Sequence, residues 1–323
     1  MKILIIQTAF IGDVVLALPI AQAFNLYLPQ AEIHFLVRKG NENLLENHPS
    51  IHKIWSWDKK NKWSSVVKLL KAFRKERFTW VINPHRFLSS GIFTVFSKAK
   101  YTVGFEKNPL SWLFDYRLKH EIREGLHEVQ RNLSLLKPVF NTDVPLIKPK
   151  LYPSEADRAK VKMYQKEPYV VLAPASVWYT KQWEITNWIE LAQKLSEKYW
   201  VYLVGGPSDG ELCEKIKSSN ERIVNLSGKL TYLQTASLME KAIRVWVNDS
   251  APLHFATAVN APVTAIFCST TPRFGFFPLS DDSKILSDET LKCKPCGLHG
   301  KKACPQKHFM CSKSITVDMA LQM

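Results

Sequence analysis

Short apolar runs alternate with helix-length segments along the second half of the chain, and this alternation restricts the fold more than any other feature. Strands are expected at Tyr169–Ala173, Trp200–Val204, Arg222–Leu226, Arg244–Val247 and Pro262–Phe267. Helices are expected between them, at Asn187–Lys198, from about Gly210 and at Thr231–Ala242, and one that begins after Asp249 or Ser250 with Pro252 in its first turn. Strands that alternate with helices of this length imply a parallel sheet covered on both faces.

The first half begins with the same pattern. A strand at Ile3–Gln7 precedes a turn, in which Gly12 permits a backbone conformation that other residues resist, and a helix at Val14–Leu28. Further strands are expected at Glu32–Val37, Lys53–Trp57, Trp80–Asn83 and Tyr101–Phe105, and a helix at Leu126–Phe140. The 323 residues are too many for one ordinary core, and four prolines lie between positions 141 and 168. We therefore expect two α/β domains, residues 1–150 and 151–323.

Three loops of the second half are expected at the carboxyl ends of the strands, where sheets of this kind bind ligands. They are residues 174–183, 205–209 and 248–252. The helix after position 250 would point its first N–H groups outward, and such a helix end attracts phosphate. The loops and this helix carry a lysine, hydroxyls and two carboxylates, at Ser176, Thr180, Lys181, Asp209, Asp249, Ser250 and His254. They predict a nucleotide-diphosphate site, with Lys181 as a charge on phosphate and Asp209 accepting from ribose hydroxyls. The alternative is that Asp249 or Ser250 only caps the helix and His254 only packs.

Asp13 lies where the first helix is expected to begin. A carboxylate at this position is favourable for the helix dipole, so a capping role is one interpretation. A carboxylate in a ligand cleft can instead act as a general base. Neither G-x-G-x-x-G nor a Walker lysine motif is present in this first turn.

The chain carries a formal charge of +15, which favours an anionic partner. Nine basic residues against two acidic ones lie between Lys53 and Arg77, around a helical apolar pattern of Trp63, Val66, Val67, Leu70 and Phe73. This pattern suits an anionic membrane surface or a phosphorylated acceptor, with a solvated helix face as the alternative. The acceptor-side candidates are Lys59, Lys60 and Arg86.

Four of the six cysteines lie in one short segment, residues 293–311, as Cys293, Cys296, Cys304 and Cys311. Four thiolates would satisfy a tetrahedral zinc ion, which would be structural because no ligand position stays open. An iron–sulfur site, reduced structural thiols and a disulfide pair are the alternatives. Asp13 interrupts the apolar start of the chain, and no run of 18 apolar residues occurs. A cytoplasmic protein with reduced thiols is therefore expected.

Several motifs together resemble one family. They are the opening K-I-L-I-I-Q-T-A-F-I-G-D-V-V-L-A-L-P, the loop P-A-S-V-W-Y-T-K-Q-W, the G-G-P-S-D turn, and N-D-S-A-P-L-H-F-A-T-A-V-N-A-P-V-T-A-I-F. In this order they resemble the ADP-heptose:lipopolysaccharide heptosyltransferases of glycosyltransferase family nine. The cysteine segment looks most like the heptosyltransferase II branch. The chain departs from the family pattern at Ala251, where glycine is common, and at Glu184, where proline is common.

The resemblance implies a GT-B fold, in which two Rossmann-like domains take acceptor and nucleotide sugar, and inverting transfer of heptose from ADP-heptose to the lipopolysaccharide inner core. No metal is implied for transfer. By position, Asp13 would be the general base, Lys181 would contact the donor phosphates beside Ser176 and Thr180, and Asp249 would hold heptose hydroxyls. Ser250, Ala251 and His254 would take the diphosphate. Peripheral contact with the inner face of the cytoplasmic membrane is also possible. Two alternatives stay open: a glycosyltransferase that uses another nucleotide sugar and a different saccharide acceptor, and a non-enzymatic nucleic-acid-binding protein. For the enzyme no nucleic-acid partner is expected.

Overall fold

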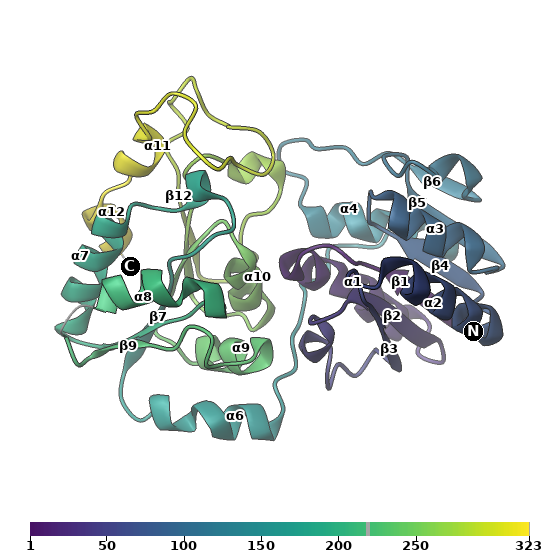
Figure 1. Ribbon diagram of the computed structural model, residues 1–323, viewed down its shortest axis with the longest axis horizontal. Helices are drawn as coiled ribbons and strands as arrows, with labels where there is room; N and C mark the ends of the chain where they lie inside the picture. Colours follow the sequence, from purple (N-terminus) through teal and green to yellow (C-terminus); the bar gives the residue numbers. More distant parts are fainter. Residues whose placement is uncertain (218–219, 323) are drawn as a thin grey trace. The chain divides into compact units, whose positions relative to one another are not determined.

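The computed structural model describes residues 1–217 and 220–322, which form two compact units. The first unit comprises residues 1–122 and 126–152, and the second comprises residues 123–125 and the chain from Pro153 onward. Each unit has one six-stranded sheet, and every strand pair in it is parallel (Figure 1). The strand orders are β3-β2-β1-β4-β5-β6 and β12-β11-β10-β7-β8-β9. In each sheet the chain begins at a central strand, adds strands toward one edge, and then returns to the centre and adds strands toward the other edge. This is the doubly wound order, so the predicted α/β class is confirmed.

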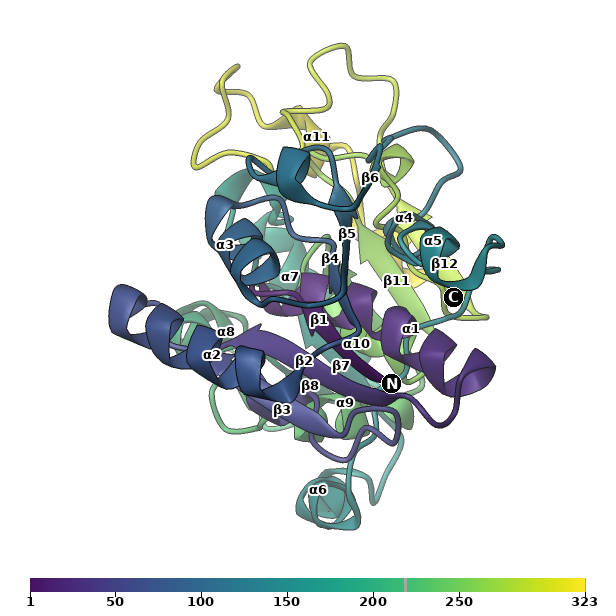
Figure 2. The same cartoon turned by 90° about the vertical axis from the view of Figure 1, so that its right-hand side faces the viewer.

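The first sheet lies between two layers of helices. Figure 2 shows α2 and α3 on one face and α1 on the other, where α1 also packs against α4. The strands are β1 (Lys2–Ile6), β2 (Glu32–Arg38), β3 (Lys53–Trp57), β4 (Trp80–Asn83), β5 (Tyr101–Phe105) and β6 (Tyr116–Leu118). The α-helices are α1 (Ile11–Tyr27), α2 (Lys62–Glu76), α3 (Leu88–Phe96), α4 (Glu128–Ser134) and α5 (Lys137–Phe140).

The second sheet is covered by α7, α8 and α12 on one face and by α9 and α10 on the other, with α6 packed on α9 (Figure 1). Its strands are β7 (Tyr169–Ala173), β8 (Trp200–Leu203), β9 (Ile223–Asn225), β10 (Val245–Asn248), β11 (Val263–Ile266) and β12 (Ser283–Leu286). Its α-helices are α6 (Glu155–Val161), α7 (Ile185–Ser196), α8 (Gly210–Lys217), α9 (Tyr232–Glu240), α10 (Ala251–Ala258), α11 (Met310–Lys313) and α12 (Val317–Leu321).

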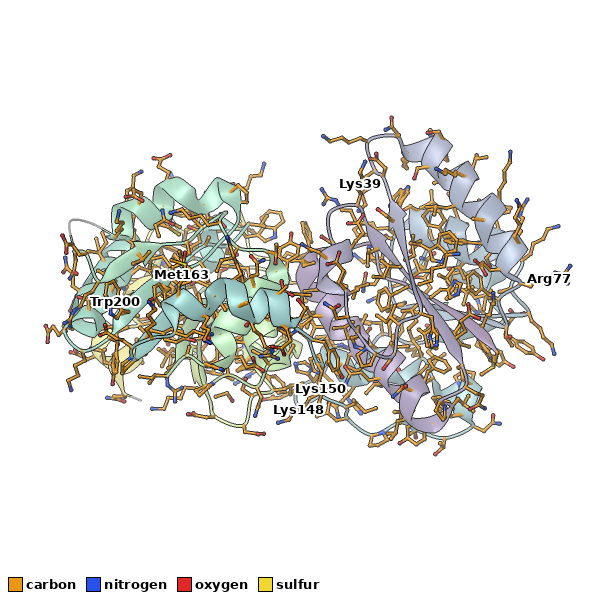
Figure 3. The ribbon with its side chains drawn as sticks, turned by 90° about the horizontal axis from the view of Figure 1, so that it is seen from below. Lys39, Arg77, Lys148, Lys150, Met163 and Trp200 are labelled. Carbon is orange, nitrogen blue, oxygen red and sulfur yellow. The ribbon has the colours of Figure 1, made fainter. Side chains whose placement is uncertain are left out.

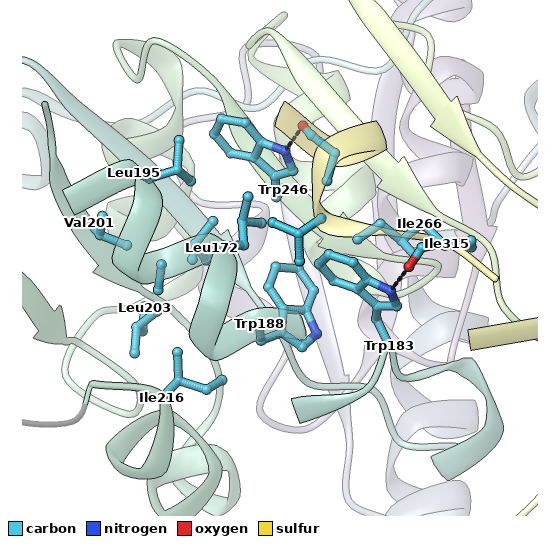
Figure 4. Close-up of a cluster of buried hydrophobic side chains, with 14 of the residues drawn as sticks. Leu172, Trp183, Trp188, Leu195, Val201, Leu203, Ile216, Trp246, Ile266 and Ile315 are labelled. Carbon is cyan, nitrogen blue, oxygen red and sulfur yellow. Dashed lines mark hydrogen bonds between the residues drawn. The ribbon is translucent and has the colours of Figure 1, made fainter. Parts of the chain in front are cut away.

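Three buried tryptophans organise the core of the second unit (Figure 4). The rings of Trp183 and Trp188 meet edge to face at 5.3 Å. The indole Nε1–H of Trp183 donates to the carbonyl of Ile315 at 2.9 Å, and that of Trp246 donates to the carbonyl of Ala320 at 2.8 Å. These two bonds satisfy buried indole N–H groups and fix the C-terminal segment on the core, whereas the buried Nε1 of Trp188 has no hydrogen-bond partner in the described structure.

Two expectations from the sequence are wrong. The helix expected at Leu126–Phe140 is broken into α4 and α5, because Pro138 cannot donate to a continuing helix and instead stands in the first turn of α5. Gly12 lies inside the first turn of α1 and is absent from the positive-φ residues of the described chain, so no special turn conformation is needed there. No helix in the described ranges has both the length and the hydropathy required to span a membrane.

Candidate functional site

The carboxyl edge of the second sheet is held together by Asn248, the last residue of β10. Its Nδ2 donates to the carbonyl of Pro174 at 2.6 Å, and its Oδ1 accepts from the backbone N–H of Trp183 at 3.0 Å. Asn248 is completely buried, so both bonds are made away from water. They fasten both ends of the 174–183 loop to the strand that leads into α10.

Lys181 and Asp249 meet at this edge. The Lys181 Nζ lies 2.7 Å from Asp249 Oδ2, with only 15% and 9% of the two side chains exposed. The Thr270 hydroxyl donates to the same carboxylate oxygen at 2.6 Å. A buried charge must be paired and hydrogen-bonded to be tolerated, and Asp249 meets both conditions. The arrangement places a buried ammonium group beside the beginning of α10.

Helix α10 begins at Ala251, with Pro252 in its first turn and Ser250 at the N-cap. The Ser250 side chain makes no capping bond to the helix; its Oγ donates instead to the carbonyl of Asn248 at 3.4 Å. The Leu253 N–H donates to the Ser250 carbonyl at 3.1 Å and Pro252 has no N–H, so the N–H of Ala251 is the first-turn donor that points toward an anion at this helix N-terminus. His254 lies one turn further on and is buried.

Three other residues expected at the site form hydrogen bonds that hold loops in place, Thr180 between two loops and the other two within one. The Thr180 hydroxyl is buried, accepts from the N–H of Lys301 at 2.8 Å and contacts Ser269 Oγ at 2.9 Å. Asp209 accepts from the N–H of Gly206 at 2.8 Å and so closes the 205–209 turn. The Ser176 carbonyl accepts from the Gln182 side chain at 2.7 Å. The structure therefore brings together Lys181, Asp249, Ser250 and Ala251, while Thr180 and Asp209 use their side-chain oxygens within loops.

In the first unit, Asp13 lies half-buried in the first turn of α1. Lys107 follows β5 and lies close enough to Asp13 for the two charges to interact. Lost hydration lowers the pKa of Lys107 to about 8, with the charges of Glu128 and Asp13 opposing this shift and those of Arg131 and Arg86 assisting it. Lys107 thus supplies a positive charge near the Asp13 carboxylate.

His85 follows β4 and lies at the same carboxyl edge of the first sheet. Its Nδ1 lies 3.1 Å from the Thr8 hydroxyl, and its buried Nε2 has no hydrogen-bond partner in the described structure. Burial lowers the pKa of His85 to about 3, and the charges of Lys59, Lys107 and Arg86 act in the same direction. Two of the acceptor-side candidates, Lys59 and Arg86, are close enough to His85 for their charges to act on it. All three candidates are exposed, and the backbone N–H of the third, Lys60, donates to Asp58 at 2.9 Å.

Glu128, at the start of α4, accepts from Arg131 Nε at 2.6 Å and contacts His120 Nε2 at 3.0 Å. Burial works against its negative charge, but the hydrogen bond with His120 and the charges of His120 and Arg131 outweigh it and lower the pKa of Glu128 to about 2. This buried network holds the start of α4 next to Lys107.

The sequence interpretation missed four residues that the structure places at these two sheet edges: Lys107, His85, Asn248 and Thr270. Lys107 and His85 each come two residues after a strand, and Asn248 ends one, so the rule that ligands bind beyond strand ends could have found them. Thr270 bonds to a carboxylate 21 positions away, a contact that no local pattern signals.

The four clustered cysteines are free thiols and border one cavity of about 330 Å³ in the second unit. The other group of possible metal ligands in the described chain, Glu32, His34 and Glu76, is already engaged. Lys2 and Lys53 each form an ion pair with Glu76, at 2.7 and 2.6 Å. Those lysines neutralise the carboxylate that a cation would need.

Comparison with known proteins places the chain in a family. The model of glycosyltransferase family 9 (heptosyltransferase) matches residues 66–308. The lipopolysaccharide core heptosyltransferase OpsX of Haemophilus influenzae is 27% identical over 83% of this chain and 79% of its own. The lipooligosaccharide heptosyltransferase 2 of the same organism is 26% identical over 88% of both chains. The solved ADP-heptose lipopolysaccharide heptosyltransferase II of Escherichia coli is 22% identical, with a TM-score of 0.79 over 99% of this chain and all of that one, which shows the GT-B fold. The chain therefore belongs to glycosyltransferase family 9, the heptosyltransferase family, and is a glycosyltransferase.

Proposed function

We propose that this enzyme transfers heptose, with inversion, from ADP-heptose to the inner core of lipopolysaccharide. The names of its relatives support this substrate pair, because they are heptosyltransferases of lipopolysaccharide and lipooligosaccharide. A solved relative, the Escherichia coli heptosyltransferase WaaC, is described with ADP-2-deoxy-2-fluoro heptose. Family membership also favours a glycosyltransferase over a nucleic-acid-binding protein.

The observation that carries the donor side is the buried ion pair between Lys181 and Asp249 beside the first turn of α10. A nucleoside diphosphate bound here would meet an ammonium group and the N–H groups of Ser250 and Ala251. Asp249 would then be available to accept from sugar hydroxyls, with His254, Ser176, Thr180 and Asp209 completing the surroundings. Donors aimed at the diphosphate stabilise the charge that develops as it leaves.

On the acceptor side, Asp13 would act as the general base. The acceptor hydroxyl oxygen attacks the anomeric carbon of heptose, the bond between that carbon and the phosphate oxygen breaks, and the hydroxyl proton passes to the Asp13 carboxylate. ADP departs with the bonding electron pair. Lys59, Lys60 and Arg86 would face the anionic acceptor, with Lys107 as a further positive charge near Asp13.

Measuring transfer from ADP-heptose to a heptose-deficient lipopolysaccharide core tests this proposal. Asp13→Asn should lower kcat by roughly 10²–10⁴-fold and leave ADP binding intact. Asp157→Asn is a matched control, since Asp157 is also a first-turn carboxylate and bonds only within the capping box of α6. Transfer by Asp13→Asn equal to that of the control would reduce Asp13 to a capping residue. Competition between ADP- and UDP-sugars tests the alternative of another donor.

We also propose a cytoplasmic location with peripheral contact to the anionic membrane surface through α2. Trp63 and Val67, two members of the apolar pattern of this helix, are 66% and 52% exposed. Basic side chains surround them, up to Arg77 at the end of α2 (Figure 3). Trp63→Ala should weaken sedimentation with vesicles that contain phosphatidylglycerol by about tenfold. Trp112→Ala is the control because this tryptophan is 67% exposed outside α2; equal binding by both variants would exclude α2 as the contact.

A further inference from the structure

We propose that Cys293, Cys296, Cys304 and Cys311 bind one structural transition-metal ion, Zn²⁺ or iron, and that this ion holds the loop between them against Thr180 and Lys181. The first part of this inference is independent of the proposed function. The second part rests on the proposed donor site, because it concerns the position of Lys181.

The four thiols come from separate turns of one loop but line the same cavity. Cys311 is buried, and the other three are half-buried. Cys311 sits in α11 and packs in the hydrophobic core of the second unit, so one ligand is fixed to the body of the fold. The other three lie on the loop that leads to it.

His308 is directed at one of these sulfur atoms. Its Nδ1 accepts from the backbone N–H of Met310 at 3.0 Å, so the proton of the neutral ring lies on Nε2. Nε2 is 4.0 Å from Cys293 Sγ, where its N–H points to the sulfur. A metal-bound thiolate gains from such a donor, which makes His308 a support of the Cys293 ligand and leaves four thiolates as the ligand set.

The chemistry of this donor set selects the ion. Thiolates are soft ligands that prefer zinc and iron, and four of them form a closed tetrahedral site. With metal–sulfur distances of about 2.3 Å, the sulfur atoms of such a site lie roughly 3.8 Å apart. No three of these thiols lie within 4.8 Å of one another in the structure. Binding would therefore draw the loop inward onto Cys311, with the positive charge of Lys301 also on the cavity wall.

The same loop is bonded to the proposed donor site. The N–H of Cys296 donates to the carbonyl of Ser269 at 2.7 Å. Between Cys296 and Cys304, Lys301 exchanges two bonds with Thr180: its N–H donates to Thr180 Oγ1 at 2.8 Å, and its carbonyl accepts from the Thr180 N–H at 3.1 Å. Gly300 lies so close that a Cβ on it would be 2.9 Å from Lys181 Cγ. An ion that fixes the ends of this segment thus fixes the residues that touch Thr180 and Lys181.

Elemental analysis of the full-length protein, purified without chelators under reducing conditions, tests the metal. We expect about one Zn or Fe per chain, and loss of that metal in Cys296→Ser and in Cys304→Ser. Cys213→Ala should retain it, because Cys213 is buried in α8 away from the cavity. Where purification strips the ion, titration with Co²⁺ should give the absorption of tetrahedral thiolate coordination. Protein that contains no transition metal and gives no such spectrum would overturn the site, as would equal metal content in all variants.

Hydrogen exchange tests the contact with Thr180 and Lys181 without relying on substrate. Removing the metal with a chelator should raise exchange in peptides that cover Tyr179–Trp183 by at least about tenfold, with β2 peptides of the first unit unchanged. Unchanged exchange at Tyr179–Trp183 would refute the positioning role. A protein that binds the metal and shows this protection but does not bind ADP would contradict the proposed donor site and leave the metal site standing.

Discussion

Replacing Lys181 with methionine removes one partner of a buried ion pair and keeps most of the side-chain volume. Asp249 would then keep its charge with only the Thr270 hydroxyl as a described side-chain partner, at 7% exposure. Breaking a buried pair on one side costs about 3–5 kcal/mol, since the remaining charge is left uncompensated. Because Thr270 still bonds to the carboxylate, we expect the lower end, about 3 kcal/mol less free energy of unfolding for the second unit.

Lys215→Met is the matched control. Lys215 Nζ lies 2.7 Å from Glu211 Oε1, the same separation as in the Lys181 pair, but the two side chains are 61% and 83% exposed. Water screens this pair, so its loss should leave stability within experimental error. The two variants therefore differ in burial and not in ion-pair distance.

Urea unfolding of the nucleotide-free protein measures both variants, and hydrogen exchange of β10 peptides assigns the transition to the second unit. The double variant Lys181→Met, Asp249→Asn should recover most of the loss, because it leaves no buried unpaired charge. If Lys181→Met is no less stable than Lys215→Met, or if the double variant is the weakest of all, the buried-pair reasoning is refuted.

Three further changes have defined outcomes. The folded pKa of Glu128 is about 2, below its ordinary value of 4.5, so the ionised carboxylate should stabilise the fold by about 3 kcal/mol above pH 4.5. This contribution should disappear as the pH falls toward 2. The difference in urea midpoint between wild type and Glu128→Gln should therefore close over that pH range. Gly104→Ala should cost about 1–3 kcal/mol in thermal unfolding, because its Cβ would lie 2.9 Å from the Asn83 carbonyl oxygen, whereas Gly210→Ala in the first turn of α8 has room and should not destabilise. Trp246→Phe should cost about 1–3 kcal/mol and speed hydrogen exchange in α12, because the Ala320 carbonyl loses its donor; unchanged exchange would contradict that anchor.

The strands of the described chain could be predicted from sequence, including the edge strands β3 and β9, with the exception of β6 and β12. β3, β4, β5 and β7 have the bounds expected from their apolar runs. The edge strands β6 and β12 carry polar, half-exposed residues, as in the sequence S-K-I-L of β12. In β6 and β12 the polar residues leave no apolar run that could reveal the strand from sequence.

The candidate site was predictable in type and only in part in detail. Lys181 and Asp249 were expected on converging loops, and they form an ion pair. The sequence could not show that Asn248 fastens the 174–183 loop, because its partner Pro174 is 74 positions away. Nor could it show that the Thr180 hydroxyl is occupied by Lys301, 121 positions away. Such roles depend on which distant segment of the chain lies next to a polar atom in the fold. The spacing of residues along the sequence does not indicate these long-range contacts.

The strand order shared by the two sheets has a consequence for biosynthesis. In each unit the central strands pair across more than 70 residues, as Ile3 with Trp80 and Val171 with Val245. The two central strands of each sheet cannot pair until the intervening chain has left the ribosome, and pairing over such separations is slow. The first unit can complete its sheet while the second is still being synthesised, because its strands end at Leu118. During translation of the second unit, β7 can pair with β8, and β8 with β9, before β10 is made. One edge of the apolar strand β7 therefore stays open until β10 emerges, and an open strand edge is a template for pairing with another chain.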